Sequence, residues 1–316
     1  MIRWLIIVSF FIYKTKALSQ TCCSAGAPLS NLITVDNTEH LLTFTLGHEY
    51  KGINLLVDNN TRLVNDPRTR FGQNLNLKTD YILGKHWAFS LSIPFIFQSR
   101  RTNSDEQSSF GLGDISLVTQ YNLIQKDNLS IFLASGIELP TGLTGHTSTS
   151  SIILSPDMQS GSGTLDFLFG GSLFYNNLSN SPLSSSIEFL YKRNGTNDNF
   201  AGTDFFEGRR FGFGHETLLT LGFNYLLVHR LGFITPDLTL KYRHSTPNRE
   251  QLIEAPNSGG FWVSLPFGLS FQPDLDKSVR VFAELPLYQD LSGLQITTSF
   301  SVGIQLRYSL QKSEPY

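Results

Sequence analysis

From Glu39 onward, hydrophobic and polar residues alternate at every second position over most of the chain. The clearest example runs from Gln295 to Leu310, where apolar residues such as Phe300 and Val302 are separated by small or polar ones. This alternation places apolar side chains on one face of a β-strand and polar side chains on the other. At roughly 3.3 Å per residue, such a strand is long enough to cross a membrane at a tilt. The pattern predicts twelve strands, over 42–51, 71–81, 87–97, 114–123, 129–139, 164–175, 183–192, 213–225, 237–243, 261–271, 279–287 and 295–310.

The connections between the predicted strands alternate in length. Short connections such as Gly84-Lys85 alternate with long polar stretches over 52–70, 99–113, 141–163, 194–210 and 245–260. Long loops at one end and tight turns at the other are typical of outer-membrane barrels. We therefore predict an all-β fold, a transmembrane antiparallel β-barrel of the outer-membrane type with about 12 strands. An even number of strands puts both termini on the periplasmic side.

Aromatic residues end the apolar faces of the even-numbered predicted strands. If these strands all run in the same direction, the rings share one height and form a girdle at a membrane interface, where the ring is buried and a hydroxyl is wet. The predicted girdle consists of Tyr81, Tyr121, Tyr175, Tyr225, Phe271 and Tyr308.

Composition and the N-terminal sequence indicate where the protein is located. The 316-residue chain has a net charge of −2, which gives no indication of a nucleic-acid partner. Arg3, an apolar run over 4–13 and Ala17-Leu18-Ser19 together predict a cleaved signal peptide. No later apolar run reaches the length of about 18 residues that a transmembrane helix needs. We expect a signal peptide over 1–19, an N-terminal periplasmic segment over 20–37 that could plug the barrel, the barrel over 38–310, a tail over 311–316, and location in the cell outer membrane.

Cys22 and Cys23 are adjacent, in a chain expected to reach a compartment that permits disulfides. A lipid-modified cysteine, a vicinal or intermolecular disulfide and free thiols all remain open. The residues before Cys22 lack the small residue expected next to a lipidated cysteine. Two adjacent cysteines without a paired histidine do not indicate a metal site.

The polar face carries charges of both signs, which would point into the barrel. These side chains could form a structural salt-bridge network or an electrostatic lining that orients solutes. Two of them, Asp114 and Asp166, fall near the extracellular rim, where they could hold a loop root or bind cargo. The lumen-lining candidates are Asp114, Glu138, Asp166, Glu188, Lys192, Glu216, Lys241, Arg280, Glu284 and Arg307.

Four prolines share a local form in which Ile or Leu precedes the proline on the inward face. A proline removes one donor from a strand ladder, so each is expected to mark a bulge or kink. Such kinks could open a lateral gap for hydrophobic cargo, or could merely end strand pairing near the rim. The four are Pro94, Pro140, Pro266 and Pro286.

Three short motifs follow one another between 110 and 166. They read Phe-Gly-Leu-Gly-Asp from Phe110, Leu-Pro-Thr-Gly from Leu139, and Gly-Ser-Gly-Thr-Leu-Asp from Gly161. In this order they resemble the outer-membrane family named for the meta-cleavage pathway of phenol degradation. That resemblance implies a barrel that transports aromatic or other hydrophobic compounds.

The sequence is compatible with three classes of function to different degrees. An outer-membrane phospholipase would need a serine beside a histidine on the outer face, and the predicted neighbours of His215 include no serine. A structural or adhesive barrel with a filled lumen is the main alternative, with the Ser- and Thr-rich loop 144–151 making contacts. We expect a non-enzymatic channel without a cofactor, for passive uptake of small hydrophobic or aromatic solutes. Its expected partners are the lipid bilayer, the solute and the barrel-assembly machinery during insertion.

Overall fold

The computed structural model describes residues 41–63, 68–101, 105–126, 128–148, 151–176, 181–201 and 208–311. The predicted signal peptide, the N-terminal segment over 20–37, and Cys22 and Cys23 lie outside the described residues. Of the predicted C-terminal tail, only Gln311 is described, as the last residue of a strand.

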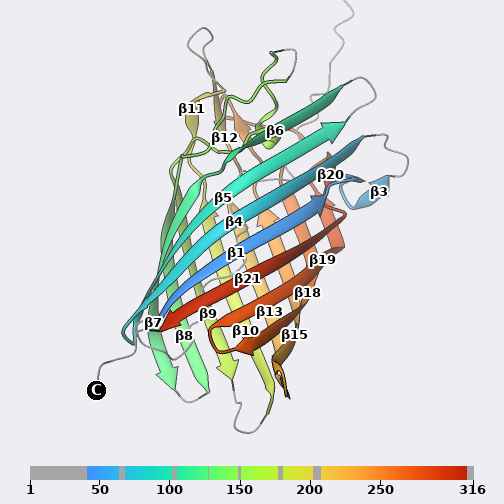
Figure 1. Ribbon diagram of the computed structural model, residues 1–316. Helices are drawn as coiled ribbons and strands as arrows, with labels where there is room; N and C mark the ends of the chain where they lie inside the picture. Colours follow the sequence, from blue (N-terminus) through green and yellow to red (C-terminus); the bar gives the residue numbers. More distant parts are fainter. Residues whose placement is uncertain are drawn as a thin grey trace, which may run out of the picture.

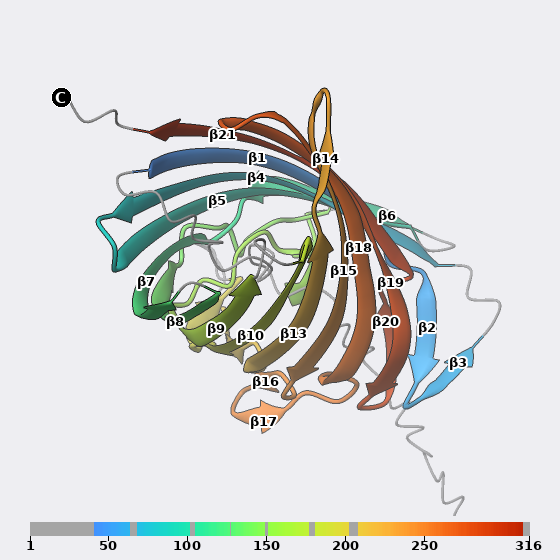
Figure 2. The ribbon, with the colours of Figure 1, turned by 90° about the horizontal axis from the view of Figure 1, so that it is seen from below.

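Twelve long antiparallel strands form a closed barrel, which confirms the predicted fold (Figure 1). Figure 2 shows the barrel from the end opposite the small loop sheets described below. Each strand pairs with the next one around the wall, and pairing of the first with the last, in register from Leu41↔Gln311 to Gly52↔Phe300, helps to complete the barrel. The twelve strands are β1 (Leu41–Gly52), β4 (Thr69–Leu83), β5 (Trp87–Arg101), β7 (Ile115–Lys126), β8 (Leu129–Leu139), β9 (Asp166–Asn176), β10 (Leu183–Arg193), β13 (Glu216–Tyr225), β15 (Gly232–Ser245), β18 (Gly260–Asp274), β19 (Lys277–Leu291) and β21 (Phe300–Gln311).

The alternation of the sequence becomes the two surfaces of the barrel. Apolar side chains such as Leu77, Phe169 and Ile304 are exposed on the outside, whereas their neighbours in sequence point inward and are less exposed. A soluble barrel would bury its apolar side chains inside. This chain instead presents them outward, as a bilayer requires. No helix in the described part of the chain is long and apolar enough to cross a membrane.

The two ends of the barrel differ. At one end, here called the turn end, the connections are tight, as at Gly84, whose positive φ of 58° suits a turn. The other end, here called the loop end, carries small additional elements (Figure 1). They are β2 (Leu55–Asp58), β3 (Thr61–Leu63) and β20 (Leu294–Thr297) in one sheet, β11 (Asn197–Phe200), β12 (Arg209–Gly212), β16 (Arg249–Glu250) and β17 (Ile253–Glu254) in another, β6 (Glu106–Leu112), and the 3-10 helix η1 (Pro156–Met158). At the turn end, β14 (Leu227–His229) extends the hairpin of β13 and β15.

One expected strand is split. The alternation over 295–310 predicted a single strand, but β20 ends at Thr297 and β21 begins at Phe300. Between them the backbone N–H of Ser299 donates to the carbonyl of Gly52, and β20 leaves the barrel to pair with β2. Thr297 is then buried, where its hydroxyl accepts a hydrogen bond from Trp262 Nε1 at 2.9 Å. Period two continues through both pieces, so the pattern alone could not reveal the break.

The four prolines behave differently from one another. Pro94 lies where the partner of β5 changes from β6 to β7, Pro140 directly follows β8, and Pro286 adjoins a register shift between β18 and β19. Pro266 pairs with Glu284 in regular register, so no bulge marks this proline.

Candidate functional site

The inside of the barrel has two chemically different walls. Inward positions of β1, β4 and β21 are mainly polar or small, with Thr43, Asn76 and Ser301 among them. On β7 to β13, by contrast, inward side chains form an apolar cluster, here called the lumen patch. It consists of Val118, Ala134, Leu168, Leu190 and Leu218.

An aromatic pair extends this apolar wall toward the turn end. The rings of Phe132 on β8 and Phe174 on β9 lie 5.9 Å apart in an edge-to-face arrangement, and Phe132 is buried. Both alternate with outward residues, since Leu133 and Tyr175 are exposed. Sequence reasoning missed the lumen patch and this pair because it recorded only the charged residues of the polar face. Apolar residues that interrupt the polar face at adjacent strands would have been the signal.

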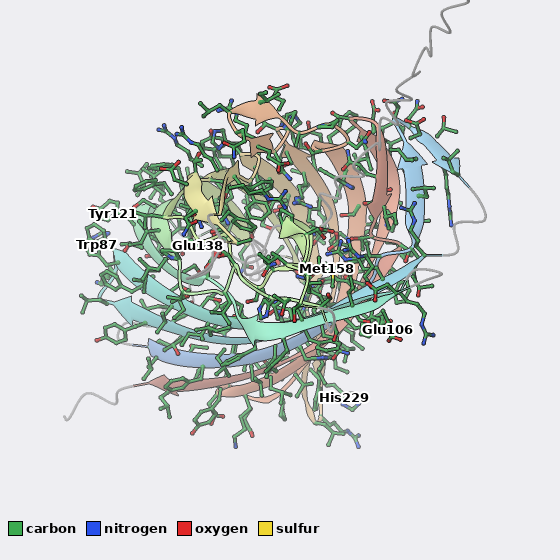
Figure 3. All side chains as sticks on the ribbon, turned by 90° about the horizontal axis from the view of Figure 1, so that it is seen from above. Trp87, Glu106, Tyr121, Glu138, Met158 and His229 are labelled. Atoms are coloured by element: carbon green, nitrogen blue, oxygen red, sulfur yellow. The ribbon has the colours of Figure 1, made fainter. Side chains whose placement is uncertain are left out.

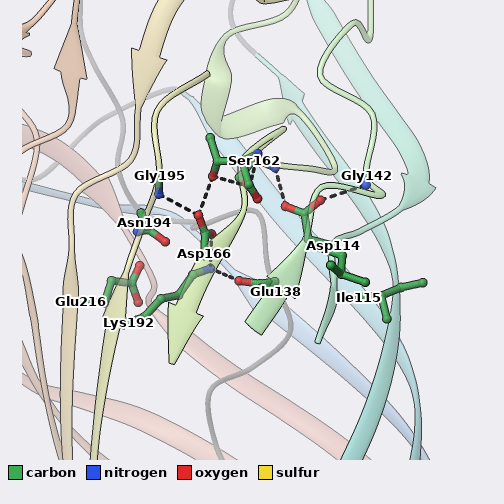
Figure 4. A network of polar contacts seen from close by, with 12 residues as sticks. Asp114, Ile115, Glu138, Gly142, Ser162, Asp166, Lys192, Asn194, Gly195 and Glu216 are labelled. Carbon is green, nitrogen blue, oxygen red and sulfur yellow. Dashed lines mark hydrogen bonds and ion pairs between the residues drawn. The ribbon is translucent and has the colours of Figure 1, made fainter. Parts of the chain in front are cut away.

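Toward the loop end, the inward face of β8, β9 and β10 carries buried charges, here called the mouth network (Figure 4). Lys192 forms an ion pair with Glu138, and its Nζ lies 3.2 Å from Asp166 Oδ2. Glu216 lies opposite Lys192 in the β10–β13 register and binds Arg243 at 2.9 Å. Because an isolated buried charge is strongly unfavourable, these groups must be held together. The structure thus joins four predicted candidates, Glu138, Asp166, Lys192 and Glu216.

Two aspartates fix the roots of the loop over 140–165. Asp114 accepts hydrogen bonds from the backbone N–H groups of Gly142 at 2.9 Å and Ser162 at 2.6 Å, and burial raises its pKa. Asp166, at the end of the loop, accepts from the hydroxyl of Thr164 at 2.5 Å and from Gly195 N–H, in the connection after β10, at 2.8 Å. A Cβ on Gly161 would lie 2.5 Å from the Cα of Gly142, so glycine is required where the two arms of the loop meet. The motifs behind the family resemblance therefore make this loop root.

The same loop reaches across to another part of the wall. Asp157, in η1, forms a fully buried ion pair with Arg70 of β4, and Arg70 also donates to Gln98 of β5 at 2.6 Å. Gln98 in turn donates to the carbonyl of Gln159 at 3.2 Å. Met158 is completely buried and lies within the outline of the barrel when viewed from the loop end (Figure 3). The loop leaves β8, contacts β4 and β5, and returns to β9, so it narrows this end of the lumen.

The wall formed by β13, β15, β18 and β19 carries further ion pairs. Lys241 binds Glu284 at 2.6 Å, and Glu284 also accepts from Ser264 at 2.7 Å. Arg280 forms a two-pronged pair with Asp237, at 3.0 and 2.7 Å, and stacks over Phe282. Most predicted lumen charges are therefore neutralised in pairs.

The two remaining candidates lie on β21 and β10. Arg307 is an inward, half-buried residue of β21. Glu188 of β10 is also half-buried, and within the described residues it has neither a hydrogen bond nor an ion pair. The charge of Lys78 acts on it from β4, but Lys78 itself lies 3.2 Å from Asp80.

The six residues of the predicted girdle are all exposed on the outside of the barrel. Each lies close to the turn end, as the pairings Tyr81↔Leu42 and Leu183↔Tyr225 illustrate. Trp87, which sequence reasoning did not assign to the girdle, lies 4.8 Å from Tyr121 between ring centroids. A second group of rings, missed from sequence, stacks near the loop end and contains Tyr50, Phe71, Phe97 and Phe300.

A serine and a histidine do meet, although not on the outer face, where a phospholipase would need them. His146 Nε2 lies 2.9 Å from Ser160 Oγ inside the loop over 140–165. Ser160 is completely buried, and no carboxylate contacts His146 in the described part of the chain. His215 instead accepts a hydrogen bond from Asn194 N–H at 3.2 Å. Both contacts support loop structure, because a nucleophile must be reachable by its substrate.

Comparison with known proteins supports the fold. No family model matches the sequence, and no curated protein matches it. Among solved structures, the COG4313 outer membrane channel from Pseudomonas putida F1 is similar at a TM-score of 0.67 and 12% identity, covering 89% of this chain and all of that one. The β domain of the Bordetella autotransporter BrkA gives a TM-score of 0.50 and 9% identity, covering 86% and 100%. At such identities the likeness is one of fold, and by fold this chain is a twelve-stranded barrel of the outer-membrane type.

Proposed function

We propose that this protein is an outer-membrane channel for passive uptake of small hydrophobic or aromatic solutes. The observation that carries the proposal is the lumen patch, a cluster of apolar side chains on the inward faces of the adjacent strands β7 to β13 that the Phe132–Phe174 pair extends. Apolar surface facing a water-filled pore is unfavourable, and a general pore for polar solutes has no use for it. It suits a solute that must leave water as it passes.

The location follows from the two surfaces of the barrel. The exposed apolar band would contact lipid, and the rings near the turn end would lie at the periplasmic interface, where one end of a Tyr is apolar and the other wet. The loop end would then face the outside. The proposal includes export through a cleaved signal peptide over 1–19 and insertion by the barrel-assembly machinery. It also includes a segment over 20–37 that occupies part of the lumen.

A narrow route fits the strand number. Barrels of about eight strands can be filled by side chains, whereas those of 16–18 strands hold open channels. Twelve strands lie between these limits, and the loop over 140–165 narrows one end further. The phenol-pathway resemblance and the outer membrane channel among the similar structures both support a channel, and selectivity for small hydrophobic solutes is our proposal.

One observation favours a second candidate, a structural barrel with a filled lumen. Leu154, Met158 and Gln159 of the inward loop are almost completely buried, and the mouth network is neutralised by its own pairs. In this alternative, the loops at the loop end would serve contact or adhesion, and no solute would pass.

Uptake separates the two candidates. Cells that produce the protein should take up the hydrophobic dye N-phenylnaphthylamine faster than vector controls, whereas proteoliposomes should admit sugars only slowly. Leu190→Gln, which interrupts the lumen patch, should reduce dye uptake. Thr239→Gln, an equivalent change at an inward position of β15, should not. Gel shift on heating confirms that each variant is folded.

Deletion of 20–37 is a further test of the same proposal. If this segment occupies the lumen, the deletion should raise single-channel conductance and leave the barrel folded. Absence of dye uptake and of conductance, before and after deletion, would favour the structural alternative.

A further inference from the structure

Next to the lumen patch lie three polar side chains without partners. Gln120 of β7 is 1% exposed, yet neither its amide oxygen nor its amide nitrogen has a hydrogen-bond partner. Ser172 of β9 is buried, and its hydroxyl likewise has none. Glu188 of β10 is the third, since no described residue forms a hydrogen bond or ion pair with it. Buried polar groups in native proteins are nearly always satisfied, so a concentration of exceptions requires an explanation.

Strand register brings these three groups to one area of the wall. Ser172 lies directly opposite Glu188 on one side and Phe132 on the other. Gln120 lies opposite Ala134, which belongs to the lumen patch. Because alternate residues of a strand share a face, Gln120, Ser172 and Glu188 all point into the barrel beside apolar side chains. An apolar surface with a few convergent polar groups is the usual composition of a small-molecule site.

Glu188 differs from three other inward glutamates in its surroundings, because no described residue forms an ion pair with it. Glu138, Glu216 and Glu284 each have a basic partner, on β10 or β15, with an oxygen–nitrogen contact of 2.9 Å or less. Glu188 has only the electrostatic effect of Lys78, a residue held 3.2 Å from Asp80. The free acceptors at Glu188 therefore suit a cationic donor that this wall does not itself supply.

We propose that this area, here called the amine site, binds an amphipathic organic cation. The apolar body would lie against Leu190, Leu218 and the Phe132–Phe174 pair, and the ammonium group would donate to Glu188. A hydroxyl or amide group on the ligand would satisfy Ser172 and Gln120. This inference names the solute class of the proposed channel and rests on that function.

A matched series of octyl compounds tests the charge requirement. Octylammonium, octanol and octanoate share one apolar chain and differ in head group. Binding to the full-length protein in lipid nanodiscs is measured by isothermal titration, with empty nanodiscs as the blank for partition into lipid. Octylammonium should bind at least about tenfold more tightly than octanol, which corresponds to the lower range for a hydrogen bond to a charged group. Octanoate should bind more weakly than either.

Two variants test the charged part and the apolar part of the amine site separately. Glu188→Gln should reduce octylammonium binding to the level of octanol and leave octanol binding unchanged. Leu190→Gln should weaken octylammonium and octanol to a similar degree. Glu49→Gln, the same chemical change on the inward face of β1, should leave all three affinities as in the wild type.

The outcomes separate this inference from the channel proposal. Equal binding of octylammonium and octanol to the wild type, or an unchanged preference in Glu188→Gln, would overturn the amine site even where dye uptake shows a working channel. A preference that Glu188→Gln abolishes, in a protein that passes no dye, would support the amine site and contradict the channel. Equal loss of preference in Glu49→Gln would show a general effect of lumen charge and would also overturn the inference.

Discussion

Arg70 and Asp157, which are 87 positions apart in the sequence, form an ion pair that is almost completely withdrawn from solvent. Arg70 belongs to β4 in the wall of the barrel, and Asp157 belongs to the 3-10 helix of the inward loop that leaves β8. Their contact therefore links this loop to a part of the wall beyond β7 and β5. Arg100 approaches the same carboxylate at 3.8 Å. The pair holds a loop in place, and its strength should therefore decide how far that end of the lumen can open.

Breaking this pair should release the loop. In Asp157→Asn, Arg70 keeps a buried charge that has lost its carboxylate, and removal of one member of a buried pair costs roughly 3–5 kcal/mol. The loop should be cleaved faster by added protease, and single-channel conductance should rise. Glu106→Gln is the matched control, because its pair with Arg101 is exposed at 60% and 69% and exposed pairs contribute about 0–1 kcal/mol. Unchanged cleavage and conductance in Asp157→Asn would show that the pair does not hold the loop.

The mouth network should matter more for stability than the ion pairs farther down the lumen. Lys192→Met leaves Glu138 and Asp166 buried without their cation, whereas Lys241→Met leaves Glu284, which is 23% exposed and keeps Ser264 as a partner. The temperature at which the folded band disappears on a gel should fall further for Lys192→Met. A larger fall for Lys241→Met would mean that burial does not set the strength of these pairs.

A charged side chain on the outer face of the barrel, near the middle of the membrane, should destabilise the fold. Phe300 is the first residue of β21, and its ring lies 6.0 Å from that of Tyr50 near the loop end, so it is too close to that end to report on mid-depth. Ile304 is nearer the middle of the strand and exposed outward. Ile304→Arg should lower the free energy of unfolding measured in lipid vesicles by roughly 2–4 kcal/mol.

The control for this substitution is Gln305→Arg, one residue along the same strand but pointing inward opposite Gly47. It should fold nearly as well as the wild type. The inward position Ser301 is unsuitable as a control, because it is 1% exposed and an arginine there would be overpacked. Equal losses at Ile304 and Gln305 would mean that the apolar face does not contact lipid.

Orientation can be tested with single cysteines in a background without Cys22 and Cys23. Ser148→Cys, in the loop over 140–165, should react with a membrane-impermeant maleimide on intact cells. Lys85→Cys, in the turn between β4 and β5, should react only after the outer membrane is permeabilised. The reverse pattern would place the turn end outside.

The inward loop should loosen in mild acid. Burial lowers the pKa of His146 from its usual value of 6.5, so the unfolded loop binds more protons than the packed one as the pH falls through this range. The stability that neutral His146 contributes is therefore present above pH 6.5 and is lost below it. Protease cleavage within 141–165 should rise between pH 7.5 and pH 5.

His146→Gln removes this titration and should make cleavage depend less on pH. Asp114, whose pKa burial raises, shifts the balance in the opposite direction, because its carboxyl loses its proton more readily in the unfolded loop than in the packed one, so its contribution to stability falls as the pH rises. A cleavage rate that keeps its full pH dependence in His146→Gln would assign the effect to other groups.

The sequence by itself determined the architecture of the barrel. Period-two alternation is a local property, so Leu77, Phe169 and Ile304 could be placed on the outer face and the strands counted without any knowledge of contacts. Glycines and long polar stretches likewise marked the turn end and the loop end. The break before Phe300 escaped this reasoning, because β20 continues the same period in another sheet.

Only the tertiary structure decided which inward groups meet. Lys192 and Glu138 lie on strands that are not neighbours, with β9 between them, and Arg70 meets Asp157 only because a loop that leaves β8 folds back past β7 and β5 to β4. The lumen patch arises in the same way, since Val118, Leu168 and Leu218 lie on three different strands and come together only through strand register. Alternation fixes the face to which a side chain points, while register and loop packing fix its neighbours. Those neighbours decide whether a charge such as Glu188 is paired or left for a ligand.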